Sequence, residues 1–301
     1  MERNKKMIIG IVIVVLIIIG AYFLLRSSNS VTVVNEQNIS TTTNNVATTT
    51  KPVNKDQTVI GTSVEGRDIV AYHYGTGGAE LLFVGGIHGG YEWNTSLVAY
   101  KAMSYLKANP DIIPTGVKVT VIPVLNPDGL YKVVGTTTGN FTAADVKEAD
   151  IAGFGRFNGN NVDLNRNFDC DWKTNATWQN KAVSGGSAVF SEPESLAIKN
   201  YVEANRPNEV IVWYSAAGGV FSSNCHNGVS AETKLLTSVY AKASGYPGSE
   251  EFNFYETTGD MTNWLAKINV PAISVLLTNH TDIEWTKNLA GIQALLKNIP
   301  K

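Results

Sequence analysis

Four short apolar runs, separated by stretches with helix signals, constrain the fold of this chain more than any other feature. The runs cover residues 81–84, 117–125, 209–213 and 272–277. Runs of this length are typical of buried strands. Helices are expected at about 94–108, 191–204, 231–244 and 282–296. Because strands that alternate with helices build a sheet covered by helices, the pattern predicts an α/β fold.

Local signals set the expected ends of several elements. Residues 58–74 read as a hairpin, because two β-prone runs flank a glycine turn. Asn94 or Thr95 is expected to cap the helix that follows the first apolar run. Ser191 is the expected cap of the next helix, since Pro193 and two acidic residues follow it.

The N-terminal part is expected to lie outside the folded domain, which is predicted at 58–301. Residues 7–25 (MIIGIVIVVLIIIGAYFLL) contain no charge and no proline, and such a run is long enough to span a bilayer. The basic residues within 1–6 put the N-terminus in the cytoplasm by the positive-inside rule. A cleavable signal peptide is the alternative, but its apolar region is usually shorter. Residues 26–57 are rich in Ser, Thr and Asn and read as a flexible stalk, so we expect a single-pass cell-membrane anchor and an extracytoplasmic domain.

The composition is that of an ordinary globular protein without excess basic charge. Of the 301 residues, 44% are hydrophobic, which is enough for one sizeable core. Lys and Arg number 24 and Asp and Glu 26, for a formal net charge of -2. A nucleic-acid-binding surface is therefore not expected.

The stretch 85–94 (GGIHGGYEWN) joins the first apolar run to the first helix and holds two candidate metal ligands. His88 and Glu92 fall where a strand of an α/β sheet ends, the usual place for a site. An imidazole and a carboxylate are typical zinc ligands. Taken alone, a histidine beside glycines is more often a hydrogen-bonded turn residue than a ligand, and Glu92 is then a first-turn glutamate.

Two further stretches have a distinctive arrangement of arginine, asparagine and glycine. They are 155–168 (GRFNGNNVDLNRNF) and 126–129 (NPDG). The first resembles the arginine motif of the zinc carboxypeptidases, the carboxypeptidase A-like metallopeptidases, and the second is also similar to that family. The resemblance runs from about Val59 to the C-terminus, with the motifs in the family's order. It implies a three-layer α/β/α fold with a mixed central sheet, one zinc ion, and removal of C-terminal residues from peptides.

The resemblance also implies roles for residues around the substrate. Arg166, with Asn165 beside it, resembles the arginine that clamps the substrate's terminal carboxylate, which a planar guanidinium suits. Arg156 resembles the arginine that stabilises the oxyanion. Tyr255 resembles the tyrosine that closes over the substrate, and Thr262 stands in the pocket for the terminal side chain, which by analogy would favour a neutral residue. Salt bridging within the loop for the arginines, and plain packing for Tyr255, are the alternatives.

Two positions depart from the family where the chemistry takes place. Tyr214 stands where the family has its third zinc ligand, a histidine before a serine. A phenol has a free pKa of about 10, so it is a poor ligand at neutral pH. Leu276 stands where the family has its catalytic glutamate, and a leucine cannot act as general base. His226 and His280 are spare histidines, and neither occupies the family's ligand position.

The spacing of the first two ligands also differs from the family's pattern. One more residue separates His88 from Glu92 than in the family, and the Gly89-Gly90 pair could absorb it.

The two cysteines, Cys170 and Cys225, follow the arginine motif and the Tyr214 strand. An even count in an extracytoplasmic domain favours a disulfide, and two buried thiols are the alternative.

Three functions are compatible with this sequence. The first is a membrane-anchored family member that binds the C-terminal ends of peptides or proteins, cell-wall peptides among the candidates, with a degenerate zinc site and little or no hydrolysis. The second is an active zinc metallocarboxypeptidase that releases neutral C-terminal residues and uses Tyr214 or a spare histidine as ligand. The third is a structural or adhesion domain on a stalk.

Overall fold

The computed structural model describes residues 56–147 and 155–299. The expected tail (1–6), membrane span (7–25) and nearly all of the stalk (26–57) lie outside the described residues and stay predictions. Within the described part, none of the helices combines the length and the apolar character that crossing a bilayer requires.

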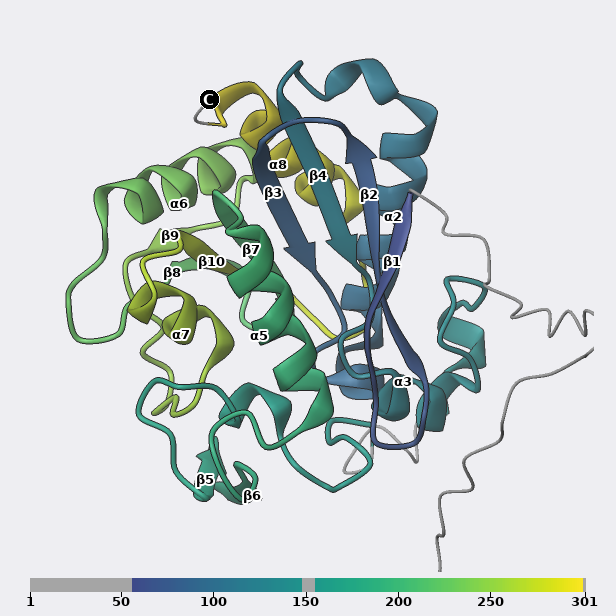
Figure 1. Cartoon of the computed structure of the whole chain (residues 1–301), viewed down its shortest axis with the longest axis vertical. Coiled ribbons are helices and arrows are strands. Elements are labelled where there is room, and N and C mark those ends of the chain that lie inside the picture. The colour runs from purple at the N-terminus through teal and green to yellow at the C-terminus, as the bar shows by residue number, and fades with distance from the viewer. Residues whose placement is uncertain (1–55, 148–154, 300–301) are drawn as a thin grey trace, which may run out of the picture. The chain divides into compact units, whose positions relative to one another are not determined.

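A mixed eight-stranded sheet forms the centre of the fold (Figure 1). Its strands are β1 (Gln57–Thr62), β2 (Asp68–Gly75), β3 (Ala79–Val84), β4 (Val117–Ile122), β7 (Glu209–Ser215), β8 (Gly219–Ser222), β9 (Gly248–Ser249) and β10 (Ala272–Leu277). They lie in the order β1-β2-β4-β3-β7-β10-β8-β9. The central strands β4, β3, β7 and β10 are parallel, whereas β2 and β8 pair antiparallel with the strands that they adjoin in this central group. The predicted α/β class with a mixed central sheet is confirmed.

Helices cover both faces of the sheet and bury two apolar cores (Figure 1). The helices α2 (Trp93–Ala108), α6 (Ala231–Ser244) and α8 (Trp285–Asn298) pack on one face, and α5 (Pro193–Asn205) and α7 (Met261–Lys267) on the other. Residues of one strand alternate between the two cores, as the pleat requires. In β7, Trp213 points to the α6 side, where it stacks on Phe83 at a centroid distance of 5.1 Å, whereas Tyr214 belongs to the core of the α5 side. Tyr214 therefore faces the side of the sheet that α5 and α7 cover.

Most of the expected elements are present, but both expected helix caps are wrong. Helix α2 begins at Trp93, so Asn94 and Thr95 lie inside its first turn. Thr95 Oγ1 donates to the Glu92 carbonyl at 2.7 Å and accepts from the Gly86 N–H, so its hydroxyl is not available as a cap. In α5 the cap position is Glu192, and the Ser191 hydroxyl donates to the Glu192 carboxylate instead.

Several short elements have no clear signal in the sequence. They are the hairpin of β5 (Asn175–Trp178) and β6 (Lys181–Ser184) and the strands β8 and β9. Helix α3 (Pro127–Val134), also not predicted, does have local signals, because Asn126 caps it, Pro127 begins it and Gly135 follows its end. Strand β8 has only four residues, and it is extended because it pairs with β10. Contacts between distant segments, rather than local periodicity, define β8 and β9.

Candidate active site

One cavity of about 190 Å³ lies on the α5 and α7 side of the sheet, near the carboxyl ends of the parallel strands. Its lining includes all nine residues expected for the substrate and the metal, namely His88, Glu92, Arg156, Asn165, Arg166, Tyr214, Tyr255, Thr262 and Leu276. Ligands of open α/β sheets bind at this edge. The structure therefore brings the predicted residues together in a single hollow.

The loop after β3 presents His88 at the bottom of this cavity. His88 precedes a 3-10 turn, η1 (Gly89–Glu92), that leads directly into α2. Gly89 has φ +47°, in the left-handed region that favours glycine. A Cβ on Gly90 would come within 2.2 Å of Val133 Cγ2, so only glycine lets the turn pack against α3. The longer spacing between the two candidate ligands is accommodated by this glycine turn.

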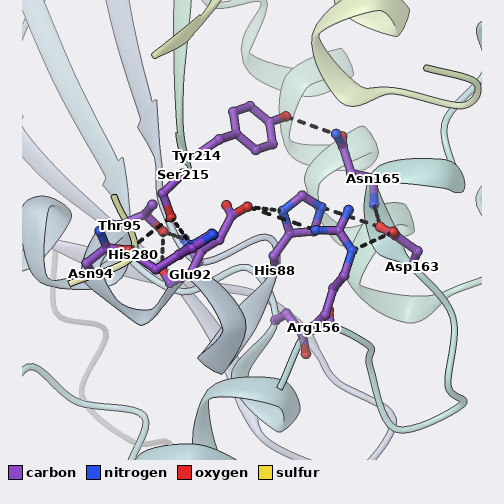
Figure 2. A network of polar contacts seen from close by, with 12 residues as sticks. His88, Glu92, Asn94, Thr95, Arg156, Asp163, Asn165, Tyr214, Ser215 and His280 are labelled. Carbon is purple, nitrogen blue, oxygen red and sulfur yellow. Dashed lines mark hydrogen bonds and ion pairs between the residues drawn. The ribbon is translucent and has the colours of Figure 1, made fainter. Parts of the chain in front are cut away.

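His88 and Glu92 form a buried pair at the floor of the site (Figure 2). His88 Nδ1 lies 2.9 Å from Glu92 Oε1, and His88 Nε2 lies 3.4 Å from Asp163 Oδ1. Neither contact has hydrogen-bond geometry, so both ring nitrogens and Glu92 Oε2 are buried polar atoms without a hydrogen-bond partner. Such atoms are costly to bury unless a ligand satisfies them, and a divalent cation would take one ring nitrogen and a carboxylate oxygen.

Asp163 ties the metal pair to the arginine loop, a role that the sequence analysis did not assign. Its carboxylate accepts from Arg156 Nε at 2.8 Å through Oδ2 and faces His88 through Oδ1. Burial raises the pKa of Asp163, but the neighbouring Arg156 first, and then His88 and Arg166, outweigh burial and lower its pKa below the usual range. Asp163 is therefore ionised at neutral pH and places a negative charge beside His88 Nε2.

Tyr214, at the position of the missing histidine, holds its hydroxyl against the arginine loop. The hydroxyl donates to Asn165 Oδ1 at 3.2 Å, as Figure 2 shows, and the ring lies 5.7 Å from the His88 ring. Burial first, and then the charges of Asp260 and Glu92, raise the pKa of Tyr214 well above 10. The side chain is thus a neutral phenol with its proton committed to an amide oxygen.

The donor set for a catalytic zinc is one ligand short. Catalytic zinc sites normally have three protein ligands and an open position for water. In residues 56–147 and 155–299, one group of three His, Cys, Asp or Glu has ligand atoms close enough to share an ion, and it comprises Cys170, Cys225 and His226. The pair His88 and Glu92 fits two ligands of a zinc ion, but the described residues do not complete the set, and no hydrolytic step is assigned to the metal.

Leu276 occupies the wall beside Tyr214. The two residues are Cα partners on the parallel strands β10 and β7, so the two departures from the family are direct neighbours. Leu276 is 8% exposed and belongs to the apolar core of that face. Glu284, a nearby carboxylate in sequence, is engaged elsewhere, because it accepts from the Thr278 backbone N–H and from Lys287. It does not replace the missing base.

Two further carboxylates line the cavity besides Glu92. Asp260 is buried and accepts from Asn165 Nδ2 at 2.7 Å and from Thr262 Oγ1 at 2.8 Å. Glu251 is exposed. Asp260 thus holds the Thr262 hydroxyl in the cavity wall.

Arg166 presents an unpaired guanidinium nitrogen in a buried setting. The residue is 1% exposed, and Nε and Nη1 donate to the backbone oxygens of Thr177 and Asn165 at 2.8 and 2.7 Å. Nη2 has no hydrogen-bond partner. Two backbone acceptors fix the plane of the guanidinium and leave the third nitrogen for an anion. Asn165, by contrast, is fully used, because its Oδ1 also accepts from the Met261 N–H.

Aromatic side chains hold Arg156 and Tyr255 at the same site. The Arg156 guanidinium lies 4.2 Å from the centre of the Trp178 ring, and its Nη1 is 4.0 Å from Glu92 Oε1. Tyr255 packs against Phe252 with ring centroids 4.9 Å apart, and burial raises its pKa. The structure places Tyr255 on the cavity wall, where packing and contact with a ligand are both compatible with its geometry.

A network at the end of β7 was not expected from the sequence. Asn94 Nδ2 donates to the carbonyls of Asn279 and Asp282, which turns its Oδ1 toward Ser215. The Ser215 hydroxyl donates to that oxygen at 3.2 Å, so His280 Nδ1, 2.8 Å from the hydroxyl, acts as donor. Burial lowers the pKa of His280, which keeps the ring neutral. Because the hydrogen-bonded partners lie 65 to 188 positions apart in the sequence, only the folded chain reveals this network.

The predicted disulfide is confirmed. Cys170 and Cys225 are bonded, with their Cα atoms 6.1 Å apart. The bridge links the loop that carries Arg166 to the segment after β8, next to Asn224 of the cavity wall.

Comparison with known proteins identifies the class. A sequence profile of the zinc carboxypeptidase family matches residues 44–281. The chain therefore belongs to the zinc carboxypeptidase family. It is 29% identical over 182 residues to the carboxypeptidase N catalytic chain of Homo sapiens, which covers 56% of this chain and 37% of that protein. It is 33% identical over 127 residues to carboxypeptidase Z of Rattus norvegicus, 36% of this chain and 17% of that one. The matches thus span well under half the length of these relatives.

Solved structures agree on the fold. The murein-tripeptide amidase MpaA from Escherichia coli O157 superposes with a TM-score of 0.56 at 20% identity, over 81% of this chain and 93% of that one. Bovine thrombin-activatable fibrinolysis inhibitor, in complex with tick carboxypeptidase inhibitor, gives a TM-score of 0.63 at 16% identity, over 80% and 88% of the two chains. At these identities the likeness concerns the fold.

Proposed function

We propose that this protein binds the carboxyl-terminal ends of peptides and hydrolyses them little or not at all. The observation that carries the proposal is Arg166 Nη2, a buried cationic nitrogen without a partner in a residue that lines the cavity. A peptide carboxylate supplies the missing acceptor and a compensating charge. Thr262 and the neighbouring hydroxyl of Ser274, 3.1 Å away, offer a small, neutral surface to the last side chain.

The low hydrolysis is inferred from Tyr214 and Leu276, which line the same cavity. Leu276 provides no base, and general acid–base catalysis contributes about a hundredfold to ten-thousandfold in rate. Tyr214 offers a neutral hydroxyl that is bonded to Asn165, so it is not poised to complete a metal site. Peptide binding needs neither of these functions.

We further propose that the domain lies outside the cytoplasm on a membrane anchor. The apolar run 7–25, preceded by basic residues, supports the anchor. The disulfide supports an oxidising compartment, where such bonds persist. Peptides of the cell wall are among the candidate ligands in that location.

The test compares a peptide that has a free C-terminal carboxylate with the same peptide amidated. Binding to wild type should favour the free acid by about 1.5–3 kcal/mol, about 10- to 150-fold, the contribution of a charge-assisted hydrogen bond. Arg166→Ala should abolish this preference. Arg206→Ala, which removes an exposed arginine at the end of α5, is the matched control and should keep it. An equal preference in wild type and Arg166→Ala would refute the assignment of the carboxylate.

An active metallocarboxypeptidase is the second candidate, because His88 and Glu92 still present buried atoms without partners. Release of a neutral C-terminal residue from a blocked dipeptide, measured with and without added zinc, distinguishes the two. Turnover by wild type at the rate of ordinary family members would establish an active metallocarboxypeptidase and rule out a protein that only binds peptide ends.

A further inference from the structure

The disulfide lies in a cluster of metal-binding side chains outside the lining of the cavity. The Sγ atoms of Cys170 and Cys225 and a ring nitrogen of His226 all lie within 4.8 Å of one another. The Asp171 carboxylate is 2.8 Å from His226 Nε2, and its other oxygen is 3.9 Å from Cys170 Sγ. Two sulfurs and an imidazole are donors typical of zinc, and the carboxylate lies against the imidazole.

The backbone brings these side chains together from two distant loops. Each cysteine is followed by a residue with positive φ, Asp171 at +53° and His226 at +65°. This region is uncommon for residues other than glycine, although Asp and His adopt it more often than most. The same left-handed turn after both cysteines folds the next side chain back toward the sulfurs.

We propose that Cys170, Cys225 and His226 form a redox-dependent zinc site that is available when the disulfide is reduced. A dithiol reductant supplies two electrons and two protons, the S–S bond breaks, two thiols form, and the reductant becomes a disulfide. Zinc then binds both sulfurs as thiolates and displaces their two protons to solvent. Asp171 accepts from His226 Nε2–H and leaves Nδ1 as the ligand nitrogen, the arrangement of a carboxylate–histidine–zinc unit.

The geometry requires only a small movement. Two sulfurs at about 2.3 Å from a tetrahedral ion lie about 3.8 Å apart. The Cα atoms of Cys170 and Cys225 are already 6.1 Å apart, so side-chain rotation can open the pair to that separation. His226 is 71% exposed in its side chain, which leaves a path for the ion and a fourth position for water. The zinc would keep the arginine loop attached to the segment after β8 when the covalent link is lost.

The experiment measures binding of zinc and of its spectroscopic substitute cobalt to the oxidised and the reduced protein. His88→Ala is the background, so that the cavity pair does not contribute. Reduction should add one equivalent of bound zinc, and cobalt should give a sulfur-to-metal charge-transfer band. No additional zinc on reduction, with both thiols verified by mass, would overturn the proposal.

Variants separate this site from adventitious binding. His226→Ala should weaken zinc binding to the reduced protein by more than the about 10- to 100-fold expected for an outer-shell partner. Asp171→Asn should weaken it within that range. Asp169→Asn is the matched control. It removes a surface carboxylate that lies two positions before Asp171 and pairs with Lys267, and it should leave zinc binding unchanged. Zinc binding that survives in the Cys170→Ser/Cys225→Ser double variant under reductant would place the site elsewhere, and the far-UV spectrum of each variant verifies that it is folded.

Discussion

Two walls of the cavity differ in their chemistry. On the arginine wall, Asp163, Arg156 and Arg166 form a buried, oriented set of charges, and the amide of Asn165 makes its hydrogen bonds within it. On the strand wall, Tyr214 and Leu276 stand side by side, at the positions to which the sequence resemblance assigns a metal ligand and a base. A polar network of this kind is costly to break piece by piece, whereas the strand wall meets it through one hydrogen bond, from the Tyr214 hydroxyl to Asn165. The comparison separates anchoring of a peptide end from cleavage.

The largest effect is expected from repairing the strand wall. In Tyr214→His/Leu276→Glu, the introduced imidazole and carboxylate stand on paired positions beside His88 and Glu92. Zinc should bind stoichiometrically, and release of a neutral C-terminal residue should exceed that of the matched Tyr214→His/Leu276→Gln variant by about a hundredfold to ten-thousandfold. The glutamine has the size of the base without its charge. Equal turnover of the two double variants, both loaded with zinc, would show that the site has drifted beyond these two positions.

Breaking the arginine wall should cost most in stability. Asp163→Ala leaves Arg156 buried without its partner, and removal of one member of a buried pair costs about 3–5 kcal/mol. Urea unfolding measures the loss. Asp169→Ala, which removes a surface ion pair with Lys267, should cost about 0–1 kcal/mol. Similar losses in the two variants would contradict the buried-network account.

The stabilisation from the Asp163 carboxylate should also depend on pH in a defined direction. Because the folded pKa of Asp163 lies below the unfolded value of about 3.9, its ionisation contributes in full above that value. The contribution declines as the pH falls from there toward the folded pKa. The stability difference between wild type and Asp163→Ala should therefore be constant between pH 5 and 7, within about 0.5 kcal/mol, and should shrink below about pH 4. A difference that already shrinks between pH 7 and 5 would show that another group controls it.

Removal of the disulfide between the arginine loop and the segment after β8 should have the next largest effect on stability. Cys170→Ala/Cys225→Ala removes a cross-link with a sequence separation of 55 residues, for which about 2–4 kcal/mol is typical. Because the bridge holds the arginine loop next to Asn224, the preference for a free carboxylate should fall as well. Thermal melting and the amidated-peptide comparison measure the two effects. A stable double variant with an unchanged preference would show that the loop is held by its hydrogen bonds alone.

The sequence predicts much of the fold and less of the site, for physical reasons. The buried strands around Leu82 and Val212 have continuous apolar runs, and such runs can be recognised from neighbouring residues in the sequence alone. The role of Asp163 requires knowledge of the atoms that surround its carboxylate, which the arginine motif does not give. That Tyr214 and Leu276 are neighbours follows from the register of two strands 62 positions apart (276 − 214 = 62), so the sequence identified each change but not their adjacency.

The smallest effect is expected from the Tyr214 hydroxyl, and it decides whether Tyr214 belongs to the metal site. Tyr214→Phe removes one hydrogen bond to Asn165 Oδ1, which keeps the Met261 N–H as donor, so the loss of stability should be about 0.5–1.5 kcal/mol. Tyr240→Phe is the matched control, because its buried hydroxyl donates to Asn288 and it lies in the other core. Zinc affinity should be unchanged in both variants, since the raised pKa of Tyr214 keeps the phenol neutral. Zinc binding to wild type should accordingly give no tyrosinate absorption. If Tyr214→Phe alone weakened zinc binding tenfold or more, the phenol would be a ligand, and the strand wall would still serve the metal.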